Sequence, residues 1–205
     1  MSELMEKFTK KDVRIIKKEN LHKRYFETNL YHLQHRKFDG GWTPEFTREV
    51  FERGHAAAIL LYDPDRSEFV LLEQFRFPAM ETSDSPWMIE VVAGIIDEGE
   101  TAEDVCRREA VEEAGIEVTS LVKAPSFLVS PGGTTERLHT FVGRVDASNA
   151  GGIFGLEEET EDIRVHVVGE DTVKQWLDDG TIDNATALII LQWFFLNKAH
   201  VISQL

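Results

Sequence analysis

Three glutamates at helical spacing, Glu109, Glu112 and Glu113, are the residues of this sequence best suited to do chemistry. Positions i, i+3 and i+4 of a helix lie side by side, so the three carboxylates would share one face. Like charges so placed destabilise a helix, and no cation is interleaved at that spacing, since Arg107 and Arg108 lie on the preceding flank. Hard divalent cations such as Mg²⁺ bind carboxylate oxygens and would turn this repulsion into coordination. We therefore expect a metal site here rather than a solvated acidic surface.

The residues around this cluster predict a helix over residues 102–114 that follows a glycine-containing loop. Thr101 with Asp104 three positions later is a typical N-cap signal, and Gly115 supplies the stop at the other end. Glycine permits tight turns in the loop of residues 94–100, so backbone carbonyls can come close to the same ions. The loop and the helix are thus expected to form one cation site.

At these residues the sequence resembles the Nudix hydrolases, whose box reads G, five residues, E, seven residues, R-E-U-x-E-E-x-G-U, with U apolar. Every defined position is filled, by Gly94, Glu100, Arg108, Glu109, Ala110, Glu112, Glu113, Gly115 and Ile116. The resemblance implies an α/β fold, an α/β/α sandwich around a mixed sheet, in which the box forms a loop, a helix and a loop. It also implies an enzyme that uses Mg²⁺ or Mn²⁺ to cleave a nucleoside diphosphate linked to another moiety.

The resemblance assigns roles within the box. Glu109 and Glu113 are the leading metal ligands. Glu112 is close behind them, and the backbone carbonyl of Ala93 is a further ligand. Arg108 is expected to orient the carboxylates rather than to touch the substrate. A pyrophosphate carries charges that repel an attacking water, so bound cations must neutralise its oxygens and a base must align the water. We expect Mg²⁺, with Mn²⁺ as an alternative, at about two or three ions per site.

The stretch SFLVSPGGTTER (residues 126–137), with Pro131 fifteen residues past Ile116, resembles the ADP-ribose pyrophosphatase subgroup of the family. The stretches RGHAAAILL, EQFRFPA and DNATALIILQW strengthen the resemblance, which covers about residues 24–197. It implies hydrolysis of ADP-ribose to AMP and ribose 5-phosphate. Hydrolases of other nucleotide sugars, including GDP-mannose, share much of this framework and stay an alternative. A Nudix-like module that binds a nucleotide without cleaving it is a further alternative, which the complete set of acidic positions disfavours.

A second acidic run, LEEETEDIRVHVV (residues 156–168), is the expected place of the catalytic base. In the resembled subgroup the base lies on a mobile loop outside the box. Matching the E-x-E-D-I-R-V element makes Glu159 the base and Glu161 an additional metal ligand, with Glu158 as the alternative base. A solvated acidic loop is the simpler interpretation. The glycines of residues 151–155 favour a loop that closes over the substrate.

Substrate contacts need positive charge and aromatic surface, which this acidic chain offers in few places. Arg76 follows an apolar strand and could bind a phosphate through two hydrogen bonds, with a surface ion pair as the alternative. Tyr25 and Phe26 could stack on adenine, although an aromatic residue in a strand more often belongs to the core. The resemblance adds nucleotide contacts from Arg48, Glu49 and Arg53, a contact near the terminal ribose from Glu136, and completion of the site from a partner subunit by Ser130, Pro131 and Gly132.

The elements that must position these residues are strands with interspersed helices, which predicts a mixed α/β class. Residues 24–38 read as antiparallel strands that end at the turn of residues 39–41. The remaining expectations are two apolar strands within residues 54–77 joined by a turn at 63–65, an apolar run at 88–93, strands near 121–129, 138–145 and 163–168, and helices at 170–179 and 184–200.

We expect two regions, an N-terminal β extension (residues 1–53) and a Nudix hydrolase domain (residues 54–205). The extension carries aromatic and apolar side chains that a small isolated sheet cannot cover alone. In the resembled subgroup such a segment is exchanged between subunits. We therefore expect the strands of about residues 24–38 to pack on a second subunit, in a homodimer with two composite active sites. A monomer whose strands fold back on their own core is the alternative.

The composition narrows the range of partners. A net charge of −15 argues against a nucleic-acid surface, although carboxylates that hold divalent cations still attract a small phosphorylated ligand. The apolar run of residues 187–196 is too short to span a bilayer and predicts a core helix. The N-terminal residues lack the apolar segment of a signal peptide, and the lone Cys106 predicts a small buried residue in a reducing compartment. We expect a cytoplasmic protein without a membrane partner.

Overall fold

The computed structural model describes residues 8–205, with Glu159 described by its backbone alone, and these residues fall into two units. The first unit comprises the chain up to Gly54 together with Leu128–Glu136. The second comprises His55–Phe127 and Arg137–Leu205. Each unit has its own sheet.

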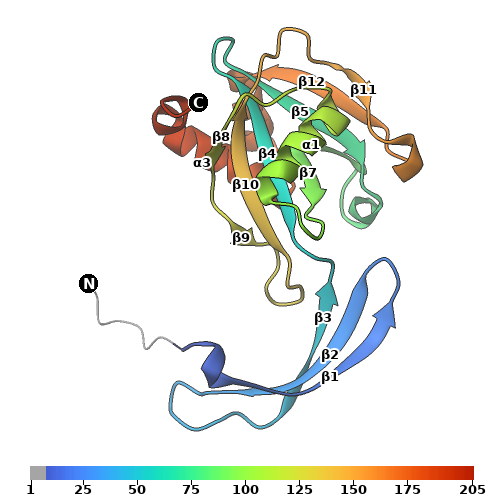
Figure 1. The fold of residues 1–205 in the computed structure, drawn as a ribbon, viewed down its shortest axis with the longest axis vertical. Helices are drawn as coiled ribbons and strands as arrows, with labels where there is room; N and C mark the ends of the chain where they lie inside the picture. The colour runs from blue at the N-terminus through green and yellow to red at the C-terminus, as the bar shows by residue number, and fades with distance from the viewer. Residues whose placement is uncertain (1–7) are drawn as a thin grey trace. The chain divides into compact units, whose positions relative to one another are not determined.

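The first unit is a three-stranded antiparallel sheet in the order β1–β2–β3, drawn in blue in Figure 1. Its elements are the 3₁₀-helix η1 (Lys10–Asp12) and the strands β1 (Val13–Lys23), β2 (Glu27–His35) and β3 (Phe46–Glu52).

The prediction of antiparallel strands within residues 24–38 is only partly right. That segment contains β2, but both partner strands, β1 and β3, lie outside it. β1 could not be predicted from the sequence because nearly all its side chains are exposed, so it lacks the apolar/polar alternation of a half-buried strand. The turn at residues 39–41 is confirmed, with Gly40 and Gly41 at φ values of 92° and 75° that favour glycine.

The second unit is built on a mixed sheet with strand order β11–β12–β5–β4–β10–β8, in which β10 pairs with β4 in parallel. Three shorter strands extend it: β6 pairs with β5, β7 with β4, and β9 with β10. The strands are β4 (Ala56–Asp63), β5 (Glu68–Phe75), β6 (Trp87–Glu90), β7 (Val92–Ile95), β8 (Ser120–Lys123), β9 (Phe127–Leu128), β10 (Arg137–Arg144), β11 (Gly152–Phe154) and β12 (Ile163–Gly169). The helices are α1 (Ala102–Ala114), α2 (Glu170–Asp178) and α3 (Ala185–Ile202), with short 3₁₀-helices η2 (Phe77–Glu81) and η3 (Glu157–Glu159).

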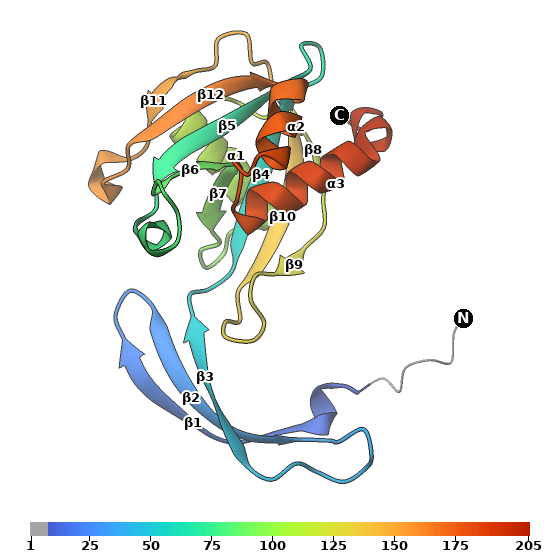
Figure 2. The same cartoon turned by 180° about the vertical axis from the view of Figure 1, so that it is seen from behind.

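Helices cover both faces of this sheet. Figure 1 shows α1 in front of the sheet, and Figure 2, from behind, shows α2 and α3 on the opposite face. β4 is buried along its whole length, and its side chains alternate between two core clusters. Ala58 and Leu60 pack with α3, whereas Ala57 and Ile59 pack with α1. The expected α/β/α sandwich around a mixed sheet is confirmed.

The apolar run near the C-terminus forms α3, which by length and composition alone could cross a membrane. Its residues Ala187, Ile190, Leu191 and Phe194 are fully buried in the core cluster of the sheet. The predicted helix of residues 184–200 is thus confirmed as a core helix, observed as Ala185–Ile202.

Two short strands differ from expectation. The predicted strand near residues 121–129 is interrupted between β8 and β9, where Pro125 lacks the N–H group that a sheet ladder needs. β11 lies in the glycine-rich segment that was interpreted as flexible, since Gly152 and its two successors pair with β12.

Candidate active site

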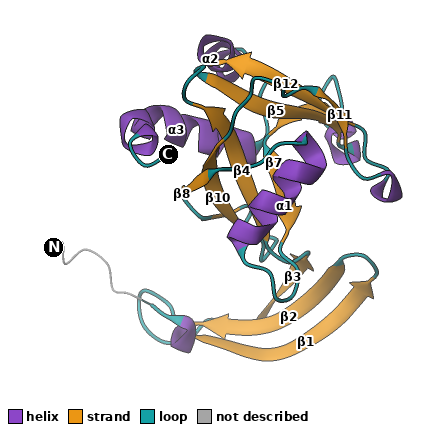
Figure 3. Ribbon diagram, turned by 45° about the horizontal axis from the view of Figure 1, so that its top comes forward, coloured by secondary structure: helices purple, strands orange, loops and turns teal. Residues whose placement is uncertain are grey.

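The helix α1 carries the acidic cluster and begins and ends where the sequence predicts. The hydroxyl of Thr101 accepts a hydrogen bond from Asp104 N at 3.2 Å, and the carboxylate of Asp104 accepts one from Thr101 N. Gly115 ends the helix in the left-handed conformation, with φ of 63°. Figure 3 shows α1 lying across the face of the sheet beside β7. These two caps and the packing on the sheet fix the direction of the carboxylates.

Arg108 binds three carboxylates of the box, so the expectation that no cation is interleaved with the glutamates is wrong. Its Nη1 donates to Glu109 Oε1 at 2.8 Å and to Glu112 Oε2 at 3.0 Å. Its Nε donates to Glu100 Oε1 at 3.0 Å, and this contact lowers the pKa of Glu100. The guanidinium therefore links the loop of residues 94–100 to the helix and offsets part of the repulsion.

Glu113 is the most deeply buried of the three glutamates, with 3% of its surface exposed. Its Oε2 accepts a hydrogen bond from Ala93 N at 3.1 Å, which brings β7 to the carboxylate. Burial raises the pKa of Glu113 to about 8, and the charges of Glu109 and Glu161 add to this rise. Burial also raises the pKa of Glu109, although Arg108 opposes the shift. A buried carboxylate with a raised pKa gains strongly from a bound cation.

Gly94 leaves room for the carboxylate of Glu109. A Cβ atom at Gly94 would lie 1.9 Å from Glu109 Oε1 and 2.6 Å from Glu109 Cγ, so the Glu109 side chain would have to shift. Glycine at this position therefore lets β7 and α1 approach closely around a charged group.

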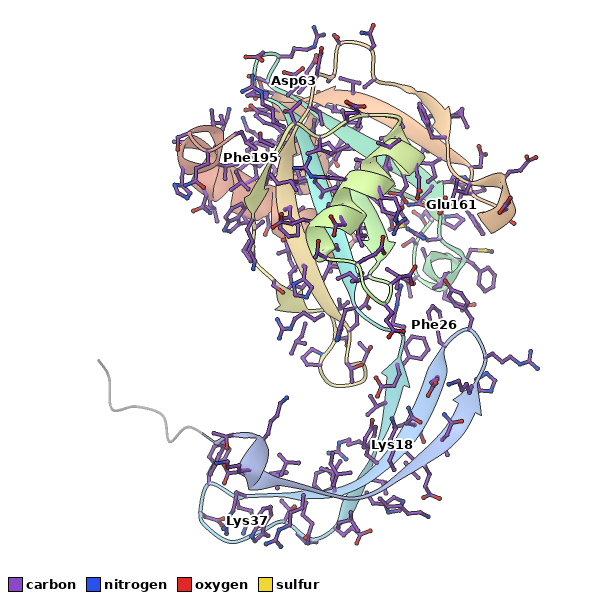
Figure 4. The ribbon with its side chains drawn as sticks, in the orientation of Figure 1. Lys18, Phe26, Lys37, Asp63, Glu161 and Phe195 are labelled. Atoms are coloured by element: carbon purple, nitrogen blue, oxygen red, sulfur yellow. The ribbon has the colours of Figure 1, made fainter. Side chains whose placement is uncertain are left out.

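The second acidic segment follows β11 as the short helix η3. Thr160 ends η3 in the left-handed conformation with φ of 59°. Glu161, labelled in Figure 4, comes next, and its Oε2 accepts a hydrogen bond from Leu156 N at 3.1 Å. Its charge acts on both Glu109 and Glu113, so Glu161 lies close to the box carboxylates. Glu158 is exposed, and the predicted base Glu159 has its backbone in η3 while its side chain lies outside the described atoms.

The carboxylates offer oxygen ligands only, which fits a hard divalent cation. As the side chains stand, no group of three His, Cys, Asp or Glu residues within residues 8–205, Glu159 apart, is arranged to hold a metal ion. Glu109 and Glu112 face Arg108 instead, and Glu113 faces Ala93 N. Each of these hydrogen bonds engages one oxygen of its carboxylate, so the other oxygen can meet a cation.

Arg76 forms the ion pair that was the alternative to phosphate binding. Its Nη2 donates to Glu90 Oε2 at 2.9 Å, while 47% of the side chain stays exposed. Glu113 and Glu161 also act on its charge, which places Arg76 beside the acidic cluster. Sequence analysis missed Glu90, although a single carboxylate inside the apolar run of residues 88–93 was an available signal.

The first unit gathers Phe26, Arg53 and Glu136. Tyr25 and Phe26 lie in the turn between β1 and β2 rather than in a strand, and Tyr25 is 82% exposed. The rings of Phe26 and Phe51 make an edge contact at 5.1 Å between centroids. The Arg53 guanidinium lies 5.3 Å from the Phe26 ring, and Arg53 Nε is 3.5 Å from Glu136 Oε1. An aromatic surface and a cation are thus side by side.

The other expected substrate contacts also lie in the first unit. Arg48 and Glu49 are neighbours in β3, so their side chains project to opposite faces of the sheet and do not share one binding surface. Arg48 stacks over the Phe46 ring at 4.6 Å. Ser130, Pro131 and Gly132 form an exposed turn that is held to β3 by a hydrogen bond from Phe51 N to Gly133 O at 2.8 Å.

Comparison with known proteins gives matches of three kinds: a family model, related proteins and a solved structure. The family model of the NUDIX domain matches residues 52–186. The ADP-ribose pyrophosphatase of Escherichia coli strain K12 is 53% identical over 190 residues, which cover 93% of this chain and 91% of that protein. A GDP-mannose pyrophosphatase of Pectobacterium atrosepticum is 34% identical over 182 residues, which cover 87% of this chain and 91% of that protein. A solved structure described as an ADP compounds hydrolase has a TM-score of 0.67 over 91% of this chain and 96% of that chain, and at 16% identity it shows a shared fold alone.

Proposed function

Because the chain belongs to the Nudix family, we propose that it hydrolyses the pyrophosphate bond of ADP-ribose to AMP and ribose 5-phosphate with the help of divalent cations. The observation that carries the proposal is the cluster of Glu109, Glu113 and Glu161 beside Arg76. Glu113 is buried and Glu109 and Glu161 are half-buried, so these mutually repelling carboxylates suit cations, and the exposed guanidinium of Arg76 suits a diphosphate.

Each residue of the site has a separate role in the proposed reaction. Glu109, Glu113 and Glu161 hold the cations, with Glu112 and the Ala93 carbonyl as further ligands. When bound, the cations supply charge neutralisation of the diphosphate oxygens. Arg108 orients the box carboxylates through its three contacts.

Arg76 donates hydrogen bonds to the diphosphate, and Glu159 accepts the proton of the attacking water, with Glu158 as the alternative base. The water oxygen bonds to phosphorus while the bridging oxygen leaves with the other phosphate. In the first unit, Phe26 offers a ring to adenine, and Arg53 and Glu136 supply polar contacts.

The similarity to a GDP-mannose pyrophosphatase makes another nucleotide sugar the second candidate substrate. The purified protein should be incubated with Mg²⁺ or Mn²⁺ and ADP-ribose, GDP-mannose or other nucleotide sugars, followed by nucleotide and phosphate analysis. We expect AMP and ribose 5-phosphate from ADP-ribose at the highest kcat/KM, and no product after chelation of the metal. A preference for GDP-mannose would replace ADP-ribose as the substrate, whereas binding without turnover of any compound would indicate a binding module.

We propose that the protein is a homodimer in which the extension of one subunit packs on the Nudix domain of the other. Charge supports this arrangement: residues 1–53 hold twelve Lys and Arg against nine Asp and Glu, whereas residues 54–205 hold ten against 28. β1 also exposes Val13, Ile15 and Ile16, at 45%, 65% and 51% of their surfaces. Opposite net charge and uncovered apolar side chains favour association with a second copy.

Light scattering at micromolar concentration measures the assembly, and a monomeric mass with full activity would contradict the composite site. A sharper test mixes Glu109→Gln subunits with Phe26→Ala subunits. If each site combines two chains, reassorted dimers contain one complete site, and about one quarter of the wild-type activity should appear in an equal mixture. A mixture of Glu109→Gln with Glu113→Gln is the matched control, because both changes lie in one domain and no reassortment restores a site.

A further inference from the structure

Glu90 lies on the sheet face that carries α1, where it is bound to Arg76. Glu90 ends β6 and is paired with Leu72 of β5. Leu72 belongs to the core cluster packed against α1, and paired residues of neighbouring strands share a face. The side chain of Glu90 therefore lies on the same sheet face as α1, with 16% of its surface exposed.

The carboxylate of Glu90 is held by donors from two side chains. Arg76 Nε donates to Oε2 at 3.1 Å and to Oε1 at 3.3 Å, and Arg76 Nη2 donates to Oε2 at 2.9 Å. Gln74 Nε2 donates to Oε2 at 3.0 Å, and Gln74 is itself only 5% exposed. Gln74 thus fixes the carboxylate, and the carboxylate fixes one edge of the guanidinium.

The opposite edge of Arg76 stays available. A guanidinium has five N–H donors, and the pair with Glu90 uses those on one side, at Nε and Nη2. The donors on Nη1 and the outer hydrogen of Nη2 remain, in a side chain that is 47% exposed. This edge has the planar geometry that binds two oxygens of a phosphate.

Arg76 has other anions within electrostatic range. The charges of Glu113 and Glu161 both act on it, and both are expected ligands of the cations. A guanidinium released from Glu90 would therefore move to those carboxylates and compete with the metal for their oxygens. Within the described residues, Glu90 is the carboxylate that accepts hydrogen bonds from both Nε and Nη2 of Arg76.

We propose that Glu90, fixed by Gln74, is a positioning residue with two effects: it holds Arg76 ready for the diphosphate and keeps its guanidinium off the metal-binding carboxylates. The first effect rests on the proposed function, because that function supplies the diphosphate that Arg76 binds. Its second effect concerns cation binding alone and can be measured without any nucleotide.

The test measures Mn²⁺ binding to the intact protein by calorimetry, without substrate, in Glu90→Ala, Arg76→Ala and the double variant. We expect Glu90→Ala to weaken Mn²⁺ binding about tenfold, the lower end of the effect of outer-shell residues. Arg76→Ala should bind Mn²⁺ at least as tightly as the wild type, and the double variant should recover that affinity. A double variant as weak as Glu90→Ala would mean that Glu90 acts through the fold rather than through Arg76, and would overturn the inference.

Steady-state kinetics with ADP-ribose supply the second measurement. At saturating Mg²⁺, Glu90→Ala should raise KM about tenfold and leave kcat within about twofold, because Arg76 is lost for binding but the cations and the base remain. Wild-type KM together with wild-type Mn²⁺ affinity would refute the inference, even if the protein is an active pyrophosphatase. Conversely, recovery of Mn²⁺ affinity in the double variant of a protein that cleaves no nucleotide would retain the positioning role and reject the function.

Two further variants serve as controls for this test. Glu90→Gln keeps the shape of the side chain and should give the same changes at smaller size, so the test survives if Glu90→Ala folds poorly. Glu73→Gln is the matched control, because Glu73 pairs with Ile89 next along β5 and β6 and binds Arg164 and His166 instead. It should leave Mn²⁺ affinity and KM unchanged.

Discussion

The acidic residues of α1 and those of residues 157–162, here called the η3 segment, are similar in composition but are held in different ways. On α1, Glu109 and Glu113 project from a helix that is capped at both ends and packed on the sheet. On the η3 segment, Glu161 follows a single short turn, and its carboxylate is held by one backbone N–H group, that of Leu156. In a capped helix, the spacing of residues in the sequence determines where their side chains lie. After a short turn, the side-chain position depends on a few local contacts.

This difference suits a division of roles. Metal ligands must keep their mutual geometry, which a helix provides through fixed spacing and through Arg108. A base must reach the water only when the substrate is present, which a segment with few contacts permits. The comparison therefore predicts that changes of Glu109 or Glu113 on α1 abolish cation binding. Changes of Glu158 or Glu159 in η3 should spare it, unlike changes of Glu161, which is itself an expected ligand.

The largest effect is expected on α1. Glu109→Gln and Glu113→Gln should each lower kcat roughly 10³-fold, because each removes a charged ligand of the cations that stabilise the transition state. Without metal, both variants should be as stable as the wild type or more so, since repulsion is reduced. Glu103→Gln, an exposed carboxylate of the same helix, is the control. Near-wild-type turnover of either variant at saturating Mg²⁺ would contradict the ligand assignment.

The helix was also the part of the fold that the sequence predicted most completely. Thr101, Asp104 and Gly115 determine its ends by local hydrogen bonds and backbone conformation, which depend on few distant residues. The contact between Arg108 and Glu112 was missed although these residues are four apart, because Arg108 was assigned to the flank. A long guanidinium reaches residues on both sides of its own position.

Elements whose form depends on distant partners were predicted less well. β1 has exposed side chains along most of its length, and only its ladder with β2 defines it. β11 has only three residues, the first of which is Gly152, so neither its length nor its sequence pattern distinguishes it from a loop. The pair of Glu90 with Arg76 joins the end of β6 to the residue that follows β5, and the sequence carries no spacing rule for such a contact.

The second prediction concerns the η3 segment. Glu159→Gln should lower kcat about 10²-fold while ADP-ribose and Mn²⁺ bind as in the wild type, because a base acts in the transition state. Single-turnover kinetics and calorimetry measure the two quantities separately. Glu158→Gln is the matched control, with an effect within about twofold on kcat. A larger loss in Glu158→Gln than in Glu159→Gln would move the base by one residue.

A third prediction compares the glycines that support the two segments. A Cβ at Gly94 would strike Glu109 Oε1 at 1.9 Å, and a Cβ at Gly155 would lie 2.7 Å from Glu161 Cβ in a backbone with φ of 105°. Both Gly94→Ala and Gly155→Ala should lower kcat/KM about tenfold, but Gly94→Ala should weaken Mn²⁺ binding more. Gly169→Ala, whose Cβ meets nothing within 4 Å, is the control. Equal Mn²⁺ affinities for the two variants would contradict the idea that α1 is held more rigidly than the η3 segment.

The smallest effect is in the stability of the metal-free protein. Burial raises the pKa of Glu113 to about 8, above the value of 4.5 expected in the unfolded chain. The folded state therefore retains a proton that the unfolded state has lost between these two values, so stability falls as the pH rises from 4.5 to about 8. In Glu113→Gln this loss is absent, and the difference in Tm between pH 5 and pH 8 should shrink by about 5 °C. Calorimetry in the presence of a chelator measures it, with Glu158→Gln as the exposed counterpart that should keep the wild-type slope. An unchanged slope in Glu113→Gln would mean that this carboxylate is ionised at little cost, and the contrast between the buried helix ligand and the exposed segment would lose its electrostatic basis.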